Sequence, residues 1–155
     1  MTVNDVVTKK VITVKRSTTL AELLKLFKKF HTFPLAPVVE EGGRLVGVVS
    51  FRNLIELLLP RRPAILKTVP FLDEEIEDIF DTDLTEEMGS LLVVDDFMET
   101  KFMSVEESVD LKDVYQLFKI HSIDQLPVVD KENKLTGMVG VFDIIIAIFK
   151  DKGIE

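Results

Sequence analysis

The chain has 155 residues, of which 46% are hydrophobic and 30% charged, a composition typical of a globular protein rather than a disordered one. It has no cysteine, which excludes disulfides, thiolate metal sites and a cysteine nucleophile. The net charge of −8 argues against a nucleic-acid partner, because phosphate binding depends on Lys and Arg. No apolar run approaches the roughly 18 residues of a membrane span, and the N-terminus does not resemble a signal peptide, so we expect a cytoplasmic protein.

The first part of the chain predicts one small β-α-β-β-α unit. Short β-branched runs indicate strands, and apolar residues spaced by three and four indicate amphipathic helices. Thr19 and Glu22 have the spacing of a capping box, which marks the start of a helix. Gly42 and Gly43 provide a turn, because glycine readily adopts positive φ. In chain order we expect a strand over 11–14, a helix from 20 to near 31, strands over 36–39 and 45–50, and a helix from about 52 to 59.

An acidic insert follows this unit. No Lys or Arg occurs between Thr68 and Thr100, and acidic residues over 73–87 alternate with apolar ones at helical spacing. This pattern indicates a helix with one solvated face. Weak binding of a divalent cation is the alternative, although Glu86 occupies the position where a calcium loop starting at Asp81 needs glycine.

The remainder of the chain repeats the first unit. Residues 35–49 return as 125–139, which lie 90 positions later, and residues 3–7 return 91 positions later. One repeat of about 60 residues would leave an apolar sheet face exposed, so two repeats are expected to pack together. We therefore predict an α+β fold with two β-α-β-β-α units packed through their sheets as a pseudo-two-fold pair. The expected domains are unit 1 over 1–59, an acidic helical linker over 60–91, and unit 2 over 92–155.

The ordered residues of both repeats resemble a known family. In the second repeat, the helical stripe that ends at His121, the run 125–130 and the run 135–144 are similar to a cystathionine-β-synthase (CBS) domain. Residues 33–40 and 45–55 look like a second CBS domain. A tandem pair of these domains is a Bateman module.

The resemblance implies a regulatory function rather than an enzyme. Members bind an adenosine-containing ligand (AMP, ADP, ATP or S-adenosylmethionine) in clefts between the two units, with no catalytic residue, no metal and no obligatory cofactor. The resemblance also implies a homodimer, and an effector protein of unknown identity that responds to the ligand.

The resemblance places the ligand where the last strand of each unit enters its last helix. The family has Ser/Thr-x-x-Asp there, with the hydroxyl near phosphate and the carboxylate on the ribose. Here the first repeat has Ser50 with Asn53, and the second has Gly140 with Asp143. Because an ionised carboxylate makes stronger hydrogen bonds than an amide, we expect Asp143 to be the better ribose ligand. The other pocket residues implied by the resemblance are Thr13, Val14, Ala36 and Pro37, and Ser104, Val105, Leu126 and Pro127.

Several alternatives stay open at this stage. Asn53 and Asp143 also suit N-terminal capping of their helices, and capping is compatible with ligand binding. His31 and His121 lie at equivalent helix ends, where a two-histidine metal site is conceivable, but no further ligand is evident and we interpret both as structural. Two alternatives concern the whole chain. It is either an interaction or dimerisation module without a ligand, or a detached cation-responsive regulatory domain of a transporter.

Overall fold

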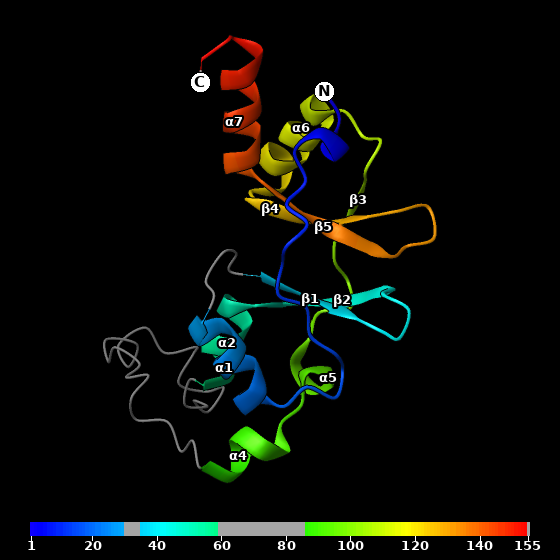
Figure 1. Cartoon of the computed structure of the whole chain (residues 1–155). Coiled ribbons are helices and arrows are strands. Elements are labelled where there is room, and N and C mark those ends of the chain that lie inside the picture. The colour runs from blue at the N-terminus through cyan, green and yellow to red at the C-terminus, as the bar shows by residue number, and fades with distance from the viewer. Residues whose placement is uncertain (30–34, 59–85, 155) are drawn as a thin grey trace, which may run out of the picture.

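The computed structural model describes residues 1–29, 35–58 and 86–154 (Figure 1). The expected acidic helix over 73–87 lies almost entirely outside these residues. The calcium-loop-like pattern that starts at Asp81 and the predicted structural role of His31 also fall outside them. What is described after the insert begins with a short helix, α4 (Glu86–Leu91).

Apart from the first strand, the two repeats form the same elements in the same order. The first contains α1 (Leu20–Lys29), β1 (Leu35–Val39), β2 (Leu45–Ser50) and α2 (Phe51–Leu58). The second contains β3 (Val105–Glu106), α6 (Leu111–His121), β4 (Gln125–Val129), β5 (Leu135–Gly140) and α7 (Val141–Asp151). Two short helical segments precede these sets, the 3-10 turn η1 (Val3–Asp5) and α5 (Val94–Phe97).

The two hairpins have matching registers. Strands β1 and β2 are antiparallel with Pro37 opposite Val48, and β4 and β5 are antiparallel with Pro127 opposite Met138. Each hairpin has a register shift at its turn end. The repeat read from the sequence therefore extends to individual residue pairs.

The strand expected over 11–14 is much shorter than predicted. In the first repeat only Val14 pairs with β1, through one parallel bridge to Val38, whereas β3 pairs with β4 over two residues. Val14 is buried, but Thr13 and Lys15 on either side are exposed. Ile12 packs against the same core but is only partly buried, and the segment does not follow β1 further.

The sheets meet in the middle of the molecule, and helices cover their outer faces (Figure 1). Side chains alternate along a strand, so Ala36 and Val38 face the helices while Pro37 faces the other sheet. Pro37 and Pro127 are fully buried, which is consistent with this contact between sheets. The hairpin turns are joined directly, because Leu45 N donates to Asn133 O at 3.0 Å. The predicted α+β pair packed through its sheets is confirmed.

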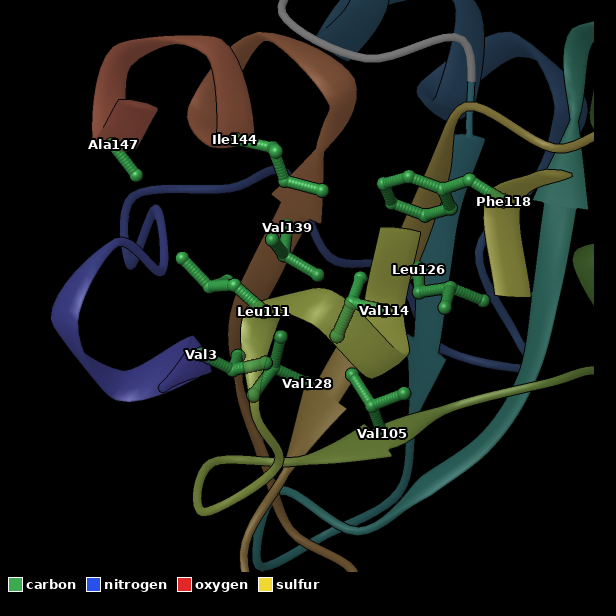
Figure 2. Close-up of a cluster of buried hydrophobic side chains, with 10 residues drawn as sticks. All are labelled: Val3, Val105, Leu111, Val114, Phe118, Leu126, Val128, Val139, Ile144 and Ala147. Carbon is green, nitrogen blue, oxygen red and sulfur yellow. The ribbon is translucent and has the colours of Figure 1, made fainter. Parts of the chain in front are cut away.

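The N-terminal segments of the two repeats are exchanged: each one packs in the core of the other repeat. Val3 is fully buried in the core of the second repeat, and its N–H donates to Val109 O at 2.9 Å. Val94 is fully buried in the core of the first repeat, and its N–H donates to Thr18 O at 2.8 Å. Figure 2 shows the Val3 side chain pointing into the core of the second repeat, beside Val128. Each core therefore contains a residue from the other predicted domain. The predicted domain limits of 1–59 and 92–155 stay predictions.

The local signals of the first repeat are found as predicted. Thr19 N–H donates to Glu22 Oε2 at 3.0 Å, and Glu22 N–H donates to Thr19 Oγ1 at 3.2 Å, which completes the capping box. Gly42 and Gly43 have φ of +85° and +86°. These left-handed conformations explain why the turn contains two glycines.

Helix α7 is apolar on both its buried and its exposed side. Ile144 and Ala147 are buried in the second core, whereas Phe142 is 71% exposed and Phe149 is 52% exposed. Among the described residues, no helix is both long enough and apolar enough to cross a membrane. The exposed side of α7 is therefore an apolar surface that no other described element covers.

Candidate functional site

Each sheet ends in a corner where three chain segments meet. The last strand enters the last helix there, and the crossing segment from the other repeat pairs with that strand. We define the first corner by Ser50, Asn53 and Glu99, and the second corner by Gly140, Asp143 and Thr8. Glu99 and Thr8 are repeat equivalents 91 positions apart, and Asn53 and Asp143 are equivalents 90 positions apart.

In the first corner, the carboxylate comes from the crossing segment. Asn53 Nδ2 donates to Glu99 Oε1 at 2.7 Å, and the Asn53 backbone N–H donates to Ser50 Oγ at 3.1 Å. The backbone of Glu99 is fixed by two hydrogen bonds with Val48, at 2.8 and 3.0 Å. The amide at position 53 thus joins the helix to a carboxylate far away in the sequence.

In the second corner, the carboxylate belongs to the helix. Asp143 Oδ2 accepts from the Gly140 N–H at 2.7 Å, and Asp143 Oδ1 accepts from Thr8 Oγ1 at 3.3 Å. Thr8 and Met138 exchange two backbone hydrogen bonds, both of 2.9 Å. Each corner therefore holds one carboxylate and one side-chain donor, with their positions interchanged.

The capping alternative is correct for Asp143 and wrong for Asn53. A capping box uses a hydroxyl at the cap and a carboxylate three residues later. The first corner keeps the hydroxyl half, through Ser50, and the second keeps the carboxylate half, through Asp143. The side chain of Asn53 does not cap α2, because its amide is bound to Glu99.

Two glycines allow the crossing segments to approach the strands. A β-carbon on Gly47 would lie 2.9 Å from Glu99 O, and one on Gly137 would lie still closer to Thr8 O. Real β-carbons do not approach a backbone oxygen so closely. The glycine in each of β2 and β5 is thus required by the exchange of segments.

Half of the other predicted pocket residues lie in the two cores. Val14, Ala36, Val105 and Leu126 are buried against the helices. They can reach a ligand in the seam only through their backbone groups, because strand alternation turns their side chains away from it. Pro37 and Pro127 face the other sheet.

The two predicted hydroxyls outside the corners are accessible. Thr13 is exposed and Ser104 is half-buried. No hydrogen bond joins either side chain to another described residue. Both hydroxyls stay available as predicted ligand contacts.

Basic side chains lie next to both corners. Lys9 and Lys10 follow Thr8, while Arg52 precedes Asn53 and Lys101 follows Glu99 by two residues. All four are exposed, and none forms an ion pair with another described residue. These basic side chains would attract an anionic ligand towards either corner.

Thr8 and Glu99 are site residues that were not predicted from the sequence. Neither belongs to the strand-to-helix motif, and each lies in the repeat opposite to the corner that it completes. The spacing of 91 that aligns residues 3–7 with 94–98 also aligns Thr8 with Glu99. That alignment identifies them as equivalents, but it gives no sign of their contact with Asp143 and Asn53.

Comparison with known proteins identifies the family. The family model of the CBS domain matches residues 3–60 and 94–150. The chain belongs to the CBS domain family. The resemblance inferred from the two repeats is confirmed, and the chain is a tandem CBS pair.

Relatives of this CBS pair include small proteins of similar length and one segment of a large enzyme. Protein MJ1426 of Methanocaldococcus jannaschii is 29% identical, over 96% of this chain and 91% of its own length. The inosine-5′-monophosphate dehydrogenase of Bifidobacterium longum is 27% identical, over 86% of this chain but only 20% of the enzyme. The similarity to the enzyme is therefore limited to a fifth of its length.

A plant CBS pair has a closely similar structure. CBSX2 from Arabidopsis thaliana is 26% identical with a TM-score of 0.70, covering 99% of this chain and 98% of that chain. A structure of CBSX2 in complex with AMP is 25% identical with a TM-score of 0.71, covering 97% and 98% of the two chains. The similarity thus extends over both repeats rather than over one CBS domain.

Proposed function

We propose that this CBS pair is a regulatory module that binds an adenosine-containing nucleotide between its two repeats and catalyses no reaction itself. The observation that carries the proposal is the second corner, where the Asp143 carboxylate lies at the start of α7 beside the crossing segment. The likeness over nearly the full length to CBSX2, which has been solved in complex with AMP, supports an adenosine ligand.

The second corner has groups suited to both halves of a nucleotide. Each oxygen of Asp143 accepts one hydrogen bond from the protein, and a carboxylate can accept about four, so capacity remains for the two ribose hydroxyls. The first turn of α7 provides backbone N–H groups and a positive dipole end, which favour a phosphate. Lys9 and Lys10, which have no ion pair among the described residues, add positive charge.

The ligand is expected to raise the thermal stability of the protein. At about 100 times its dissociation constant, a nucleotide would stabilise the folded state by about 2.7 kcal/mol. Thermal melts with AMP, ADP, ATP and S-adenosylmethionine measure this shift directly. Asp143→Ala should reduce the shift more than Asn53→Ala, because it removes a carboxylate from the ribose site rather than an amide.

Two outcomes would count against this proposal. If none of the four ligands shifts the melting temperature at millimolar concentration, the chain is an interaction module without a nucleotide. If Asn53→Ala reduces the shift more than Asp143→Ala, the preferred ribose site is the first corner. Melts of each variant without ligand provide the control, because Asp143 also caps α7.

The regulatory unit is a homodimer, formed through the exposed side of α7. Phe142, Ile148 and Phe149 are at least half exposed there. Of these three, Ile148 also lines a cavity of about 720 Å³ between α6 and α7, together with Ile144 and Ala147. A contiguous apolar surface of this kind marks a protein interface. An effector protein would then respond to ligand-dependent changes in this dimer.

Phe149→Asp is expected to convert the dimer to a monomer, because it places a charge in the apolar interface. Light scattering coupled to size-exclusion chromatography measures the mass. Leu91→Asp is the matched control, since Leu91 is 75% exposed on α4, away from α7. A wild-type chain that elutes as a monomer, or a Phe149→Asp dimer, would rule out this interface.

A further inference from the structure

The first corner has lost the carboxylate of its helix but still contains a carboxylate. Position 53 is an amide, and Glu99 from the crossing segment lies within 2.7 Å of it. Glu99 is exposed and forms no ion pair with another described residue. The corner therefore has an unneutralised negative group at its centre.

The position of Glu99 is fixed by its backbone. It exchanges two hydrogen bonds with Val48, and the adjacent Gly47 allows the close approach. A surface glutamate normally loses side-chain freedom when it binds, but here both its backbone and one carboxylate oxygen are already held. This pre-organisation is what a ligand-binding carboxylate requires.

Two acceptors remain in the first corner after the Asn53–Glu99 hydrogen bond forms. A carboxylate can only accept, so Asn53 must present its Nδ2 to Glu99, which leaves Asn53 Oδ1 free to accept. Only Glu99 Oε1 is used in this bond, which leaves Glu99 Oε2 without a partner among the described residues. A ribose carries two neighbouring hydroxyl donors, which match two acceptors.

We propose that Glu99 supplies the ribose-binding carboxylate of the first corner. Asn53 Oδ1 and Glu99 Oε2 together accept the 2′ and 3′ hydroxyls of an adenosine nucleotide. This inference rests on the proposed function and adds a second competent site to it. The exposed Arg52 and Lys101 supply the positive charge that a phosphate needs beside this corner.

Calorimetric titration with AMP tests this proposal in an Asp143→Asn background, which weakens the second corner. The wild type should bind two AMP molecules per chain, and Asp143→Asn should leave one competent site. Adding Glu99→Gln should weaken that site by about tenfold or more, because a charged hydrogen-bond acceptor becomes neutral. Glu41→Gln in the same background is the charge-matched control, since Glu41 lies at the turn end of the hairpin and is expected to leave the affinity unchanged.

A second titration with 2′-deoxy-AMP separates binding from a structural role. In the Asp143→Asn background, AMP should bind more tightly than 2′-deoxy-AMP, and Glu99→Gln should reduce that preference. A wild type that binds one AMP, lost with Asp143→Asn, would overturn this proposal but leave the proposed function intact. An unchanged affinity and an unchanged preference with Glu99→Gln would also overturn it. No AMP binding by the wild type would reject both.

Discussion

Val3→Ala is expected to loosen the second repeat, although residue 3 belongs to the first repeat in the sequence. Val3 is fully buried among the core residues of α6, β4 and β5. Removing its two methyl groups leaves a cavity in that core and should cost about 2 kcal/mol. Amide hydrogen exchange should therefore rise in α6, β4 and β5 more than in α1, β1 and β2.

Val94→Ala should give the opposite pattern. Val94 is fully buried in the core of the first repeat, so faster exchange is expected in α1, β1 and β2. Val141→Ala is the matched control, because Val141 is 39% exposed and its truncation should leave both patterns unchanged. If Val3→Ala and Val94→Ala raised exchange at the same positions, the cores would not depend separately on the exchanged segments.

The elements within each repeat could be predicted from the sequence because their signals are local. The capping box at Thr19, the glycine turn at 42–43 and the paired hairpins each depend on residues close together in the chain. Successive side chains of a strand point to opposite faces of the sheet. This alternation also fixes the register of each hairpin, because a slip by one residue would turn every apolar side chain away from the core. The strand predicted over 11–14 is reduced to one bridge at Val14, because how far a segment pairs with β1 depends on contacts distant in the sequence.

The exchange of segments could not be predicted from the same signals. Val3 and Val94 are repeat equivalents, so each suits its own core as well as the opposite one. A spacing pattern identifies equivalent positions, but it does not determine which of two equivalent cores a segment enters. The glycines at 47 and 137 are the sequence feature that the exchange requires. The reason for them becomes evident only in the structure, where the backbones of Glu99 and Thr8 lie over them.

The chemical groups of the two corners also could not be predicted from the strand-to-helix motifs alone. Read by position, the first repeat lacks a carboxylate and the second lacks a hydroxyl. In three dimensions Glu99 brings a carboxylate to the first corner, and Thr8 brings a hydroxyl to the second. Each crossing segment thus supplies the type of group that the strand-to-helix motif of that corner has lost. The corners differ in the origin of their groups more than in their chemistry.

Gly137→Ala is expected to cost about 3 kcal/mol, at the upper end of the range for overpacking. The added β-carbon would overlap Thr8 O and lie 2.7 Å from Val7 Cγ2. Thr8 is held to Met138 by two hydrogen bonds, so the crossing segment cannot move aside without breaking them. Urea unfolding of the wild type and the variant measures the loss.

Gly89→Ala is the matched control for this effect. A β-carbon on Gly89 would lie 3.6 Å from Ala21 Cβ, an ordinary contact, and alanine favours helix α4 by about 1 kcal/mol over glycine. Its stability should equal or exceed that of the wild type. Because Thr8 also donates to Asp143, Gly137→Ala should weaken AMP binding at the second corner as well as the fold. Equal stabilities for Gly137→Ala and Gly89→Ala would mean that the crossing segment is not held against β5.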